Sequence, residues 1–308
     1  MTVAAPEPGV DLVAVLEVGG SHVTSALVDR RAARVLPGSM RRRGIDPGAS
    51  AETIVNALAN AMTQLRAPAE TSWVIAMPGP FDYDRGMAWF TDVGKFDSLY
   101  GLDLGAQLRH ARPELPATVS FVNDADAFAV GEWRRGVCAG VPRCVGITLG
   151  SGVGSSFLHR GVPVTTGPTV PPEGRIHRLR IGPAGLEDVV SRRAILARYH
   201  RAVDPGATTD LDVRDVFARS RRGDVWAARV LNDAFQALGT ALTPWLARFQ
   251  ATVLVVGGSM SGSWDLVRPA LERGLSAQTD PEVALVRSAD PMGSVLVGAA
   301  LGAPPASA

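Results

Sequence analysis

Residues 12–28, Leu-Val-Ala-Val-Leu-Glu-Val-Gly-Gly-Ser-His-Val-Thr-Ser-Ala-Leu-Val, contain two apolar runs joined by a turn of small residues. Each run has the length and β-branched content of a strand, and the Gly-Gly-Ser sequence between them predicts a β-hairpin. Residues 144–159 repeat this arrangement around Gly-Ser-Gly-Val-Gly. Because helices and further strands follow each hairpin, the sequence predicts two related α/β lobes.

The elements expected after the first hairpin are strands at 34–36, 73–77 and 118–122 and helices at 50–65, 103–110 and 125–135. After the second hairpin we expect strands at 253–256 and 283–287 and helices at 186–200, 213–219, 224–249, 264–275 and 293–301. Pro244 should bend or interrupt the longest of these helices. The Gly-, Pro- and Arg-rich residues 160–185 should form an irregular loop that faces the substrate. The expected lobes are residues 10–121, completed by a C-terminal helix at 291–303, and residues 122–290.

The composition is that of an ordinary soluble globular protein, with 46% hydrophobic and 20% charged residues. The 31 basic and 30 acidic residues give no electrostatic reason to bind nucleic acid or an anionic membrane, and Arg41-Arg42-Arg43 should be a solvated face. Cys138 and Cys144 form neither a disulfide framework nor a metal pattern, which suits a reducing cytosol. No apolar run approaches the roughly 20 residues of a membrane span, and the N-terminal residues lack a signal-peptide pattern. We therefore expect a cytoplasmic protein.

The glycine-rich turns are candidate phosphate sites, because backbone N–H groups can approach an anion closely where no Cβ intervenes. The turn at 150–154 is not a dinucleotide fingerprint, since a strand rather than a helix follows it, and the chain has no Walker Gly-Lys-Ser/Thr sequence. The alternative is a purely structural hairpin turn. A third turn, Gly257-Gly258-Ser259, follows another apolar strand, and three such turns favour the phosphate interpretation.

Asn123-Asp124 is the candidate catalytic segment, because an apolar strand ends there just as a helix begins. A carboxylate at this point is held rigidly and can accept the proton of a substrate hydroxyl. The alternative is that Asp124 only caps the helix, since Asn and Asp are common at that position. The two interpretations are compatible, because capping would fix the carboxylate in place.

Five motifs taken together resemble those of the ROK family of sugar kinases and repressors, within the actin/hexokinase/Hsp70 ATPase superfamily. They correspond to the first phosphate motif, the sugar-site turn, the catalytic aspartate segment, the second phosphate motif and the nucleotide-side glycines. In this order they lie at residues 16–21, 76–80, 123–127, 149–154 and 256–259. The resemblance covers residues 12–302. It implies a two-lobed actin-like ATPase (ribonuclease H-like) fold with mixed sheets and an inter-lobe cleft.

The resemblance also implies an activity: transfer of phosphate from ATP, with Mg²⁺, to a hexose hydroxyl, that of C6, with Asp124 as the general base. The implied ATP-binding residues are Gly19, Gly20, Ser21, His22, Gly150, Ser151, Gly152, Gly154, Gly257, Gly258 and Ser259. The implied substrate-binding residues are Gly79, Asn123, Asp124, Glu173, His177 and Glu187. Closure of the lobes would exclude water from the reaction.

This sequence departs from the family pattern in two places. Glu17 stands where the family has an aspartate that faces the Mg²⁺, and it should hold the metal through water, because Mg²⁺ keeps most of its hydration shell. The family's zinc-binding cysteines are missing from residues 172–187, so we expect no structural zinc. His177 lies one residue further from Glu173 than the family motif has it, which leaves its register in the sugar site open.

Glucose is the family's default substrate, but the altered 160–187 loop, with Arg175, Arg178 and Arg180, permits a modified hexose. Related kinases for amino sugars such as kanosamine occur in antibiotic biosynthesis. A substrate amine would need a nearby carboxylate, which Glu173, Glu187 or Asp188 could supply. The sequence leaves both substrates open.

Two other classes of protein compete with the kinase interpretation. A ROK-type transcriptional repressor would need an N-terminal helix-turn-helix module, and the first phosphate motif already begins at residue 16. A non-catalytic sugar-binding protein is suggested by Glu17 and by the missing cysteines, although Asn123-Asp124 argues against it. The expected partners are a small-molecule sugar and ATP, with no nucleic acid and no membrane. Many such kinases are dimers, and the sequence leaves the oligomeric state open.

Overall fold

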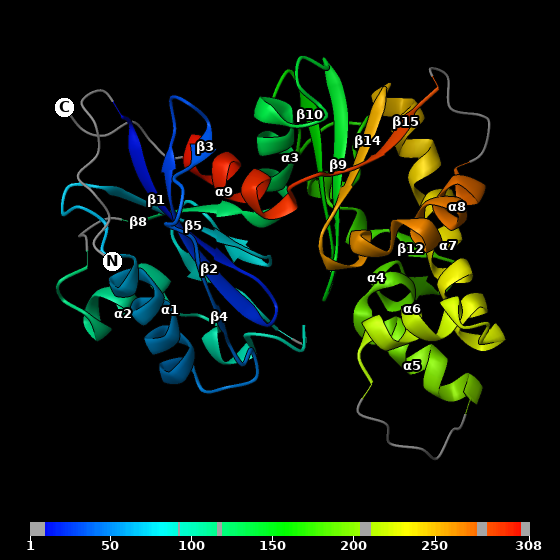
Figure 1. Ribbon diagram of the computed structural model, residues 1–308, viewed down its shortest axis with the longest axis horizontal. Coiled ribbons are helices and arrows are strands. Elements are labelled where there is room, and N and C mark those ends of the chain that lie inside the picture. The colour runs from blue at the N-terminus through cyan, green and yellow to red at the C-terminus, as the bar shows by residue number, and fades with distance from the viewer. Residues whose placement is uncertain (1–9, 92, 116–118, 204–210, 276–281, 303–308) are drawn as a thin grey trace. The chain divides into compact units, whose positions relative to one another are not determined.

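The computed structural model describes residues 10–91, 93–115, 119–203, 211–275 and 282–302 (Figure 1). The chain forms two compact units, the first made of residues 1–135 and 292–308 and the second of residues 136–291. Each unit has its own mixed sheet and its own apolar core. Among the described residues, no helix is both long enough and apolar enough to span a membrane.

The first unit is built on a sheet in the order β3-β2-β1-β5-β8, with β4 also paired to β2. Its strands are β1 (Leu12–Val18), β2 (His22–Asp29), β3 (Arg34–Val35), β4 (Arg41–Gly44), β5 (Ser72–Met77) and β8 (Val119–Asn123). Strands β1 and β2 form the predicted antiparallel hairpin, with Val18 opposite Val23. Because β5 runs parallel to β1 and β8 parallel to β5, the carboxyl ends of these three strands meet at one edge of the sheet.

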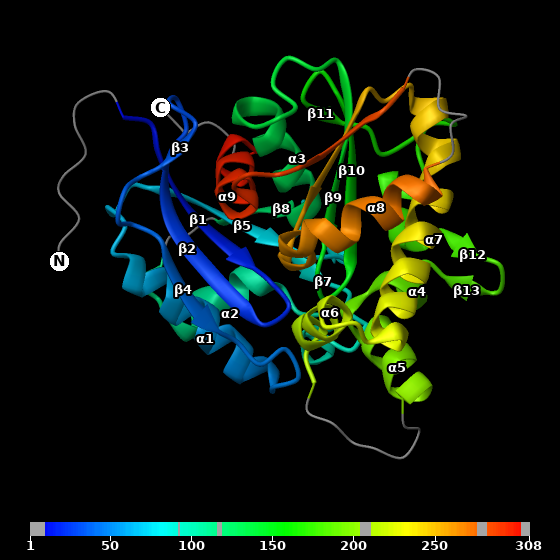
Figure 2. The same cartoon turned by 45° about the vertical axis from the view of Figure 1, so that its right-hand side comes forward.

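Helices cover both faces of this sheet (Figure 2). They are α1 (Ala51–Leu65), α2 (Leu104–Ala111), α3 (Asp124–Arg135) and α9 (Pro291–Leu301). Alternate residues of the strands, such as Leu16 and Leu27, pack against Ile54 and Leu58 of α1 and Leu104 of α2. A small hairpin of β6 (Phe81–Asp82) and β7 (Met87–Ala88) and a 3-10 turn at Asp97–Leu99 lie between β5 and α2 in the chain.

Helices α3 and α9 approach each other very closely in the first unit. A Cβ added to Gly298 would lie 1.8 Å from the carbonyl oxygen of Ala127, and one added to Gly131 would lie 1.9 Å from that of Ser294. The buried Ser294 hydroxyl donates a 2.7 Å hydrogen bond to the buried carboxyl of Glu132. Only glycine at these two positions allows the contact, so the helix that begins at Asp124 is held by backbone-to-backbone packing.

The division between the units differs from the one expected at residues 121/122. In the structure β8 pairs with β5 from Trp73–Val119 to Met77–Asn123, and α3 packs on α9. Strand β8 and all of α3 therefore belong to the first unit, which ends at Arg135. Sequence periodicity cannot reveal this boundary, because it depends on contacts with residues about 170 positions later in the chain.

The second unit has a sheet in the order β11-β10-β9-β14-β15. Its strands are β9 (Arg143–Leu149), β10 (Val153–His159), β11 (Val162–Pro163), β14 (Val253–Gly257) and β15 (Ala284–Arg287). Strands β9 and β10 form the second predicted hairpin, with Leu149 opposite Val153. Strand β14 runs parallel to β9 with Gly257 opposite Thr148, so the third glycine turn begins beside the second one.

The helices of the second unit pack against this sheet in one large apolar cluster. They are α4 (Glu187–Val190), α5 (Arg192–Val203), α6 (Val213–Arg221), α7 (Val225–Phe249) and α8 (Trp264–Gly274). The helix expected at 186–200 is broken at Ser191, whose hydroxyl accepts from the N–H of Ala194 and caps α5. Of the two effects expected of Pro244, a bend or an interruption, the interruption does not occur. Helix α7 continues through Pro244, and Leu242 and Leu246 on either side are buried.

The segment expected as an irregular loop at 160–185 contains short regular pieces. They are two 3-10 turns, Pro172–Gly174 and Ile176–Arg178, and a two-stranded hairpin of β12 (Arg180–Ile181) and β13 (Ala184–Gly185). A further 3-10 turn, Ser259–Ser263, joins β14 to α8. Elements of two or three residues carry too little periodicity to be predicted from sequence.

The close contact between α3 and α9 predicts that Gly298→Ala destabilises the protein by about 1–3 kcal/mol, the usual cost of overpacking. The matched control is Gly105→Ala in α2, where an added Cβ meets only side-chain atoms, the nearest at 3.3 Å. Chemical denaturation followed by circular dichroism measures both variants. Equal unfolding free energies for Gly298→Ala and the wild type would contradict the proposed backbone contact.

Candidate active site

The edge where β1, β5 and β8 end collects the predicted site residues of the first unit. Glu17 pairs in register with Ala76, and Met77 pairs with Asn123, so the first glycine turn, the turn after Met77 and Asp124 follow neighbouring strands. Carboxyl ends of parallel strands are where ligands bind in many α/β sheets. The turn after Met77 contains Gly79, which precedes a cis proline.

The first glycine turn has a division of roles between its residues. The N–H of Gly19 donates to the carbonyl oxygen of His22 (2.8 Å), so it closes the turn. A Cβ on Gly19 would lie 3.2 Å from Oε1 of Glu17, and its absence gives that carboxyl room. Within the described chain, the backbone N–H groups of Gly20 and Ser21 donate to no protein acceptor. These two amides, unlike that of Gly19, are left to donate to a bound anion.

Glu17 is partly buried, and its pKa is raised from 4.5 to about 7. Burial is the main cause, and the negative charge of Asp124 is the second. The Thr24 hydroxyl and the positive charge of Arg42 act in the opposite direction. Two carboxyl groups therefore interact at this edge, and a cation bound there would relieve their repulsion.

Asn123 is the residue that caps α3. Its Oδ1 accepts from the backbone N–H groups of Ala125 and Asp126, both at 3.1 Å, and its Nδ2 donates to the Tyr83 hydroxyl at 2.8 Å. The Tyr83 hydroxyl in turn donates to the carbonyl oxygen of Met77 at 3.1 Å. This chain of hydrogen bonds leaves the Asn123 amide one N–H with which to donate to a ligand.

Asp124 is the first residue of α3, and Asn123 rather than Asp124 occupies the capping position. One oxygen of Asp124, Oδ1, accepts from the N–H of Ala125 at 2.8 Å. The positive end of the helix dipole stabilises a carboxylate in this first turn. The alternative that Asp124 serves only as an N-cap is therefore weakened, because its neighbour performs that role.

The second unit contains the other two glycine turns in contact with each other. Gly150 donates to the carbonyl oxygen of Gly152 (3.0 Å) and accepts from the N–H of Arg192 (3.2 Å). A Cβ on Gly258, which has φ +83°, would lie 2.4 Å from the carbonyl oxygen of Leu149. Ser259 is also close, since its Oγ would lie 3.6 Å from a Cβ on Gly150.

Comparison with known proteins places the chain in a family. Residues 13–301 match the ROK family. The chain belongs to the ROK family. A glucokinase of Thermotoga maritima is 24% identical over 273 residues, which cover 82% of this chain and 83% of that enzyme.

Solved ROK structures share the fold. A ROK family glucokinase from Streptomyces griseus in complex with glucose and AMPPNP superposes with a TM-score of 0.76 at 22% identity, covering 94% of this chain and 98% of that one. A ROK family transcriptional regulator, a homolog of the E. coli MLC protein, gives a TM-score of 0.72 at 21% identity, covering 94% and 78%. The mixed α/β architecture expected from the motifs, that of the actin-like ATPases, is confirmed.

Glu187, which ends the family motif in this ROK protein, supports the second glycine turn. Its Oε1 accepts from the N–H of Val153 at 3.0 Å. Gly154, next in the chain, lies in β10 opposite Thr148, so Ser151, which is exposed, and Gly152, which is half-buried, lie in the turn between the strands. The carboxyl group thereby connects a predicted sugar-binding position to a predicted phosphate-binding turn.

Glu173 and the three arginines of the altered loop have protein partners. Glu173 forms a 2.6 Å ion pair with Arg178, and its side chain is 61% exposed. Arg175 donates to the carbonyl oxygen of Ser155 (2.8 Å), and Arg180 donates to that of Pro183. His177 is partly buried in the 3-10 turn that follows Glu173.

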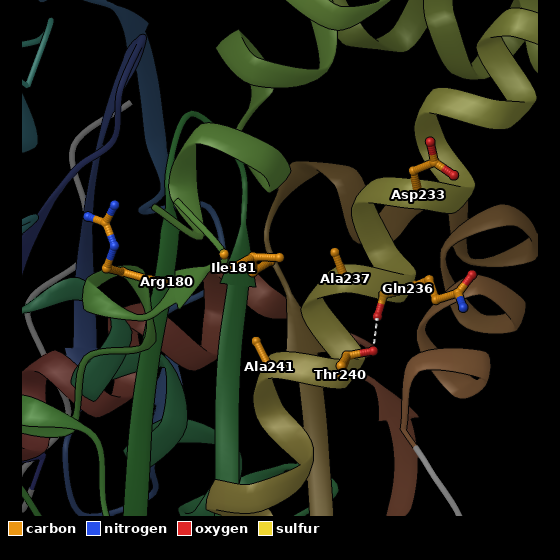
Figure 3. A pocket seen from close by; sticks show the side chains of 8 residues that line it. Arg180, Ile181, Asp233, Gln236, Ala237, Thr240 and Ala241 are labelled. Atoms are coloured by element: carbon orange, nitrogen blue, oxygen red, sulfur yellow. Dashed lines mark hydrogen bonds between the residues drawn. The ribbon is translucent and has the colours of Figure 1, made fainter. Parts of the chain in front are cut away.

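A surface hollow of about 630 Å³ lies between β12 and α7, and no residue of the three glycine turns lines it (Figure 3). It is lined by Arg180, Ile181, Gly182, Asp233, Gln236, Ala237, Thr240 and Ala241. The Thr240 hydroxyl, drawn with a dashed line in Figure 3, donates to the Gln236 carbonyl oxygen at 3.1 Å. None of the predicted ATP- or sugar-binding residues lines this hollow.

The described residues contain no group of three or more His, Cys, Asp or Glu side chains arranged to hold a metal ion. Mg²⁺ does not need such a group, because it is usually held by one or two carboxylates, substrate phosphates and water. The interacting carboxyls of Glu17 and Asp124 suit that mode of binding.

The sequence did not predict a role for two residues of the first unit, Tyr83 and Arg42. Tyr83 holds the Asn123 side chain, but nothing around an isolated tyrosine in a turn distinguishes it from a packing residue. Arg42 was assigned to a solvated face, and β4 is indeed exposed. Strand β4 pairs with β2 so that Arg42 lies opposite Thr24, which in turn lies opposite Glu17. A run of three arginines does not predict this pairing.

The raised pKa of Glu17 predicts a pH-dependent stability, because the folded protein holds this proton more tightly than the unfolded chain. This stabilisation is complete below about pH 4.5 and is lost as the pH rises to about 7. Glu17→Gln, which mimics the neutral form, should therefore gain stability relative to the wild type over this range. Unfolding free energies measured from pH 4 to pH 8 without ligands test this.

The control is Glu70→Gln at an exposed surface position, and its unfolding free energy should stay close to that of the wild type. A difference between Glu17→Gln and the wild type that is constant from pH 4 to pH 8 would contradict the assigned pKa.

Proposed function

We propose that this protein is an ATP-dependent sugar kinase that transfers the γ-phosphoryl group to a hexose, with Asp124 as the general base. The observation that carries the proposal is the position of Asp124, which begins α3 beside Glu17 and the first glycine turn. Membership of the ROK family and similarity to glucokinases support it.

In the proposed reaction Asp124 accepts the proton of the attacking sugar hydroxyl. The sugar oxygen forms a bond to the γ-phosphorus as the bond from that phosphorus to the β,γ-bridging oxygen breaks, and ADP leaves with the electron pair. Such a reaction requires mainly positioning and neutralisation of charge. The helix dipole and the Ala125 amide hold the carboxylate in place, and the remaining Asn123 N–H donates to the sugar.

The phosphates would be bound by backbone amides, those of Gly20 and Ser21 in the first unit and of Ser151 and Gly152 in the second. Glu17, with Asp124 nearby, would hold Mg²⁺ through water, and the ion when bound supplies positive charge to the β- and γ-phosphates. Glu17 in its ionised form is the competent ligand, and its raised pKa places that ionisation near neutral pH.

The proposed substrates are glucose or a glucose-like amino sugar such as kanosamine, phosphorylated at the C6 hydroxyl. Glu187 and His177 are the proposed sugar contacts in the second unit, together with Gly79 in the first. Glu173 would have to give up its ion pair with Arg178 to bind a sugar. Because that pair is exposed, exchanging it for a substrate contact costs little.

Asp124→Asn should lower kcat for sugar-dependent ADP release by roughly 10²–10⁴-fold, the usual contribution of a general base. The matched control is Asp126→Asn in the same helical turn, which should retain kcat within about tenfold because its carboxyl is not the proposed base. A coupled ADP-release assay with saturating ATP and sugar measures both variants. An Asp124→Asn enzyme within tenfold of the wild type would rule out this base.

A second candidate function is a non-catalytic sugar-binding regulator. The near-neutral pKa of Glu17 and the ion pair of Glu173 favour it, and a ROK transcriptional regulator has the same fold. The wild-type protein distinguishes the two with a panel of glucose, glucosamine, mannose, N-acetylated amino sugars and kanosamine. Sugar binding without ADP release for every member would favour the regulator.

A further inference from the structure

Strand β4 places one arginine on the same face of the sheet as Glu17. Glu17 lies opposite Thr24 in the β1–β2 pair, and Thr24 lies opposite Arg42 in the β2–β4 pair. Residues directly opposite each other in antiparallel pairs point to the same face. With strands about 4.8 Å apart, the Cα atoms of Glu17 and Arg42 are roughly 10 Å apart, which leaves room for a phosphate between the two side chains.

The neighbouring arginines lie on the other face of the sheet. Arg43 pairs with Val23, which belongs to the apolar core under α1 and α2. Arg41 pairs with Ser25, and its guanidinium donates to the carbonyl oxygens of Gly38 (2.6 Å) and Met40 (2.9 Å). Because side chains alternate along a strand, Arg42 lies on one face of the sheet and Arg41 and Arg43 lie on the other.

Arg42 makes no hydrogen bond or ion pair within the part of the chain that the structure describes. Its charge nevertheless acts on Glu17, whose pKa it lowers. The triphosphate of the proposed substrate would arrive at two carboxyl groups, Glu17 and Asp124, and this negative charge requires cationic groups near the transferred phosphoryl. An arginine with an exposed, uncommitted guanidinium suits that requirement, because its planar fork matches phosphate oxygens.

We propose that Arg42 is a phosphate-binding residue that contacts the γ-phosphate of ATP from β4, on the face of the sheet that carries Glu17. The proposal rests on the proposed kinase function and adds a residue to its site. In this proposal the Arg42 guanidinium neutralises negative charge on the γ-phosphoryl group as that group is transferred from ATP to the sugar. Since ADP lacks this phosphate, Arg42 should distinguish the two nucleotides.

The test compares Arg42→Gln and Arg42→Lys with Arg43→Gln, which removes the same charge one residue away on the opposite face. Isothermal titration with Mg²⁺ measures the Kd of AMPPNP and of ADP for each variant. Arg42→Gln should weaken AMPPNP binding by about 10–100-fold, the loss of a hydrogen bond to a charged group, and leave ADP binding within about twofold. Arg42→Lys should be intermediate, because it keeps the charge without the fork.

The same variants are assayed for sugar-dependent ADP release, where Arg42→Gln should lower kcat by about 10²-fold or more. The proposal would be overturned if Arg42→Gln bound AMPPNP as tightly as the wild type does. It would also be overturned if Arg42→Gln lost as much affinity for ADP as for AMPPNP, or if Arg43→Gln lost as much affinity for AMPPNP as Arg42→Gln. A wild type that binds AMPPNP through Arg42 but releases no ADP with any sugar would instead refute the kinase function alone. A wild type that binds no nucleotide would refute both.

Discussion

The mutual repulsion of two carboxyl groups, Glu17 and Asp124, is the constraint on which the candidate site depends. Each is presented by a different element, Glu17 by the end of β1 and Asp124 by the start of α3. Burial, and secondly the negative charge of Asp124, raise the pKa of Glu17 to about 7. The fold tolerates this arrangement because the surrounding groups, the helix dipole, the amides and Arg42, are positive. In the proposed kinase, a nucleotide that arrives with its metal would supply a cation that relieves this repulsion.

Close backbone contacts and a relay of side-chain hydrogen bonds hold the helix that carries Asp124. Gly131 and Gly298 lack a Cβ, which lets α3 pack directly against α9. The Asn123 side chain connects the first turn of α3 to the end of β5 through the Tyr83 hydroxyl. In the second unit, Gly258 lies directly on the backbone of Leu149. Rigid contacts of this type suit a site where a proton acceptor has to be placed within a fraction of an ångström.

Much of the fold could be predicted from the sequence because its signals are local. Both hairpins, the long helices and the strand into Asn123 follow from apolar periodicity and glycine turns, and the family motifs identified the superfamily. The errors involve non-local causes. The unit boundary depends on packing against α9, and the continuity of α7 through Pro244 depends on burial on both sides of it. The role of Asn123 as the cap could not be separated from that of Asp124 without side-chain positions.

The contact between α3 and α9 also has a consequence for the order in which the protein folds. Residues 136–291 form a continuous unit, whereas the first unit is interrupted and needs residues near 298 to close on residues near 127. During synthesis, the second unit can therefore complete its core while the helix that carries Asp124 still lacks its partner. The segment with the proposed catalytic carboxylate would then reach its native packing after the second unit has formed. The proposed proton acceptor would be fixed in place only once residues near 298 have left the ribosome.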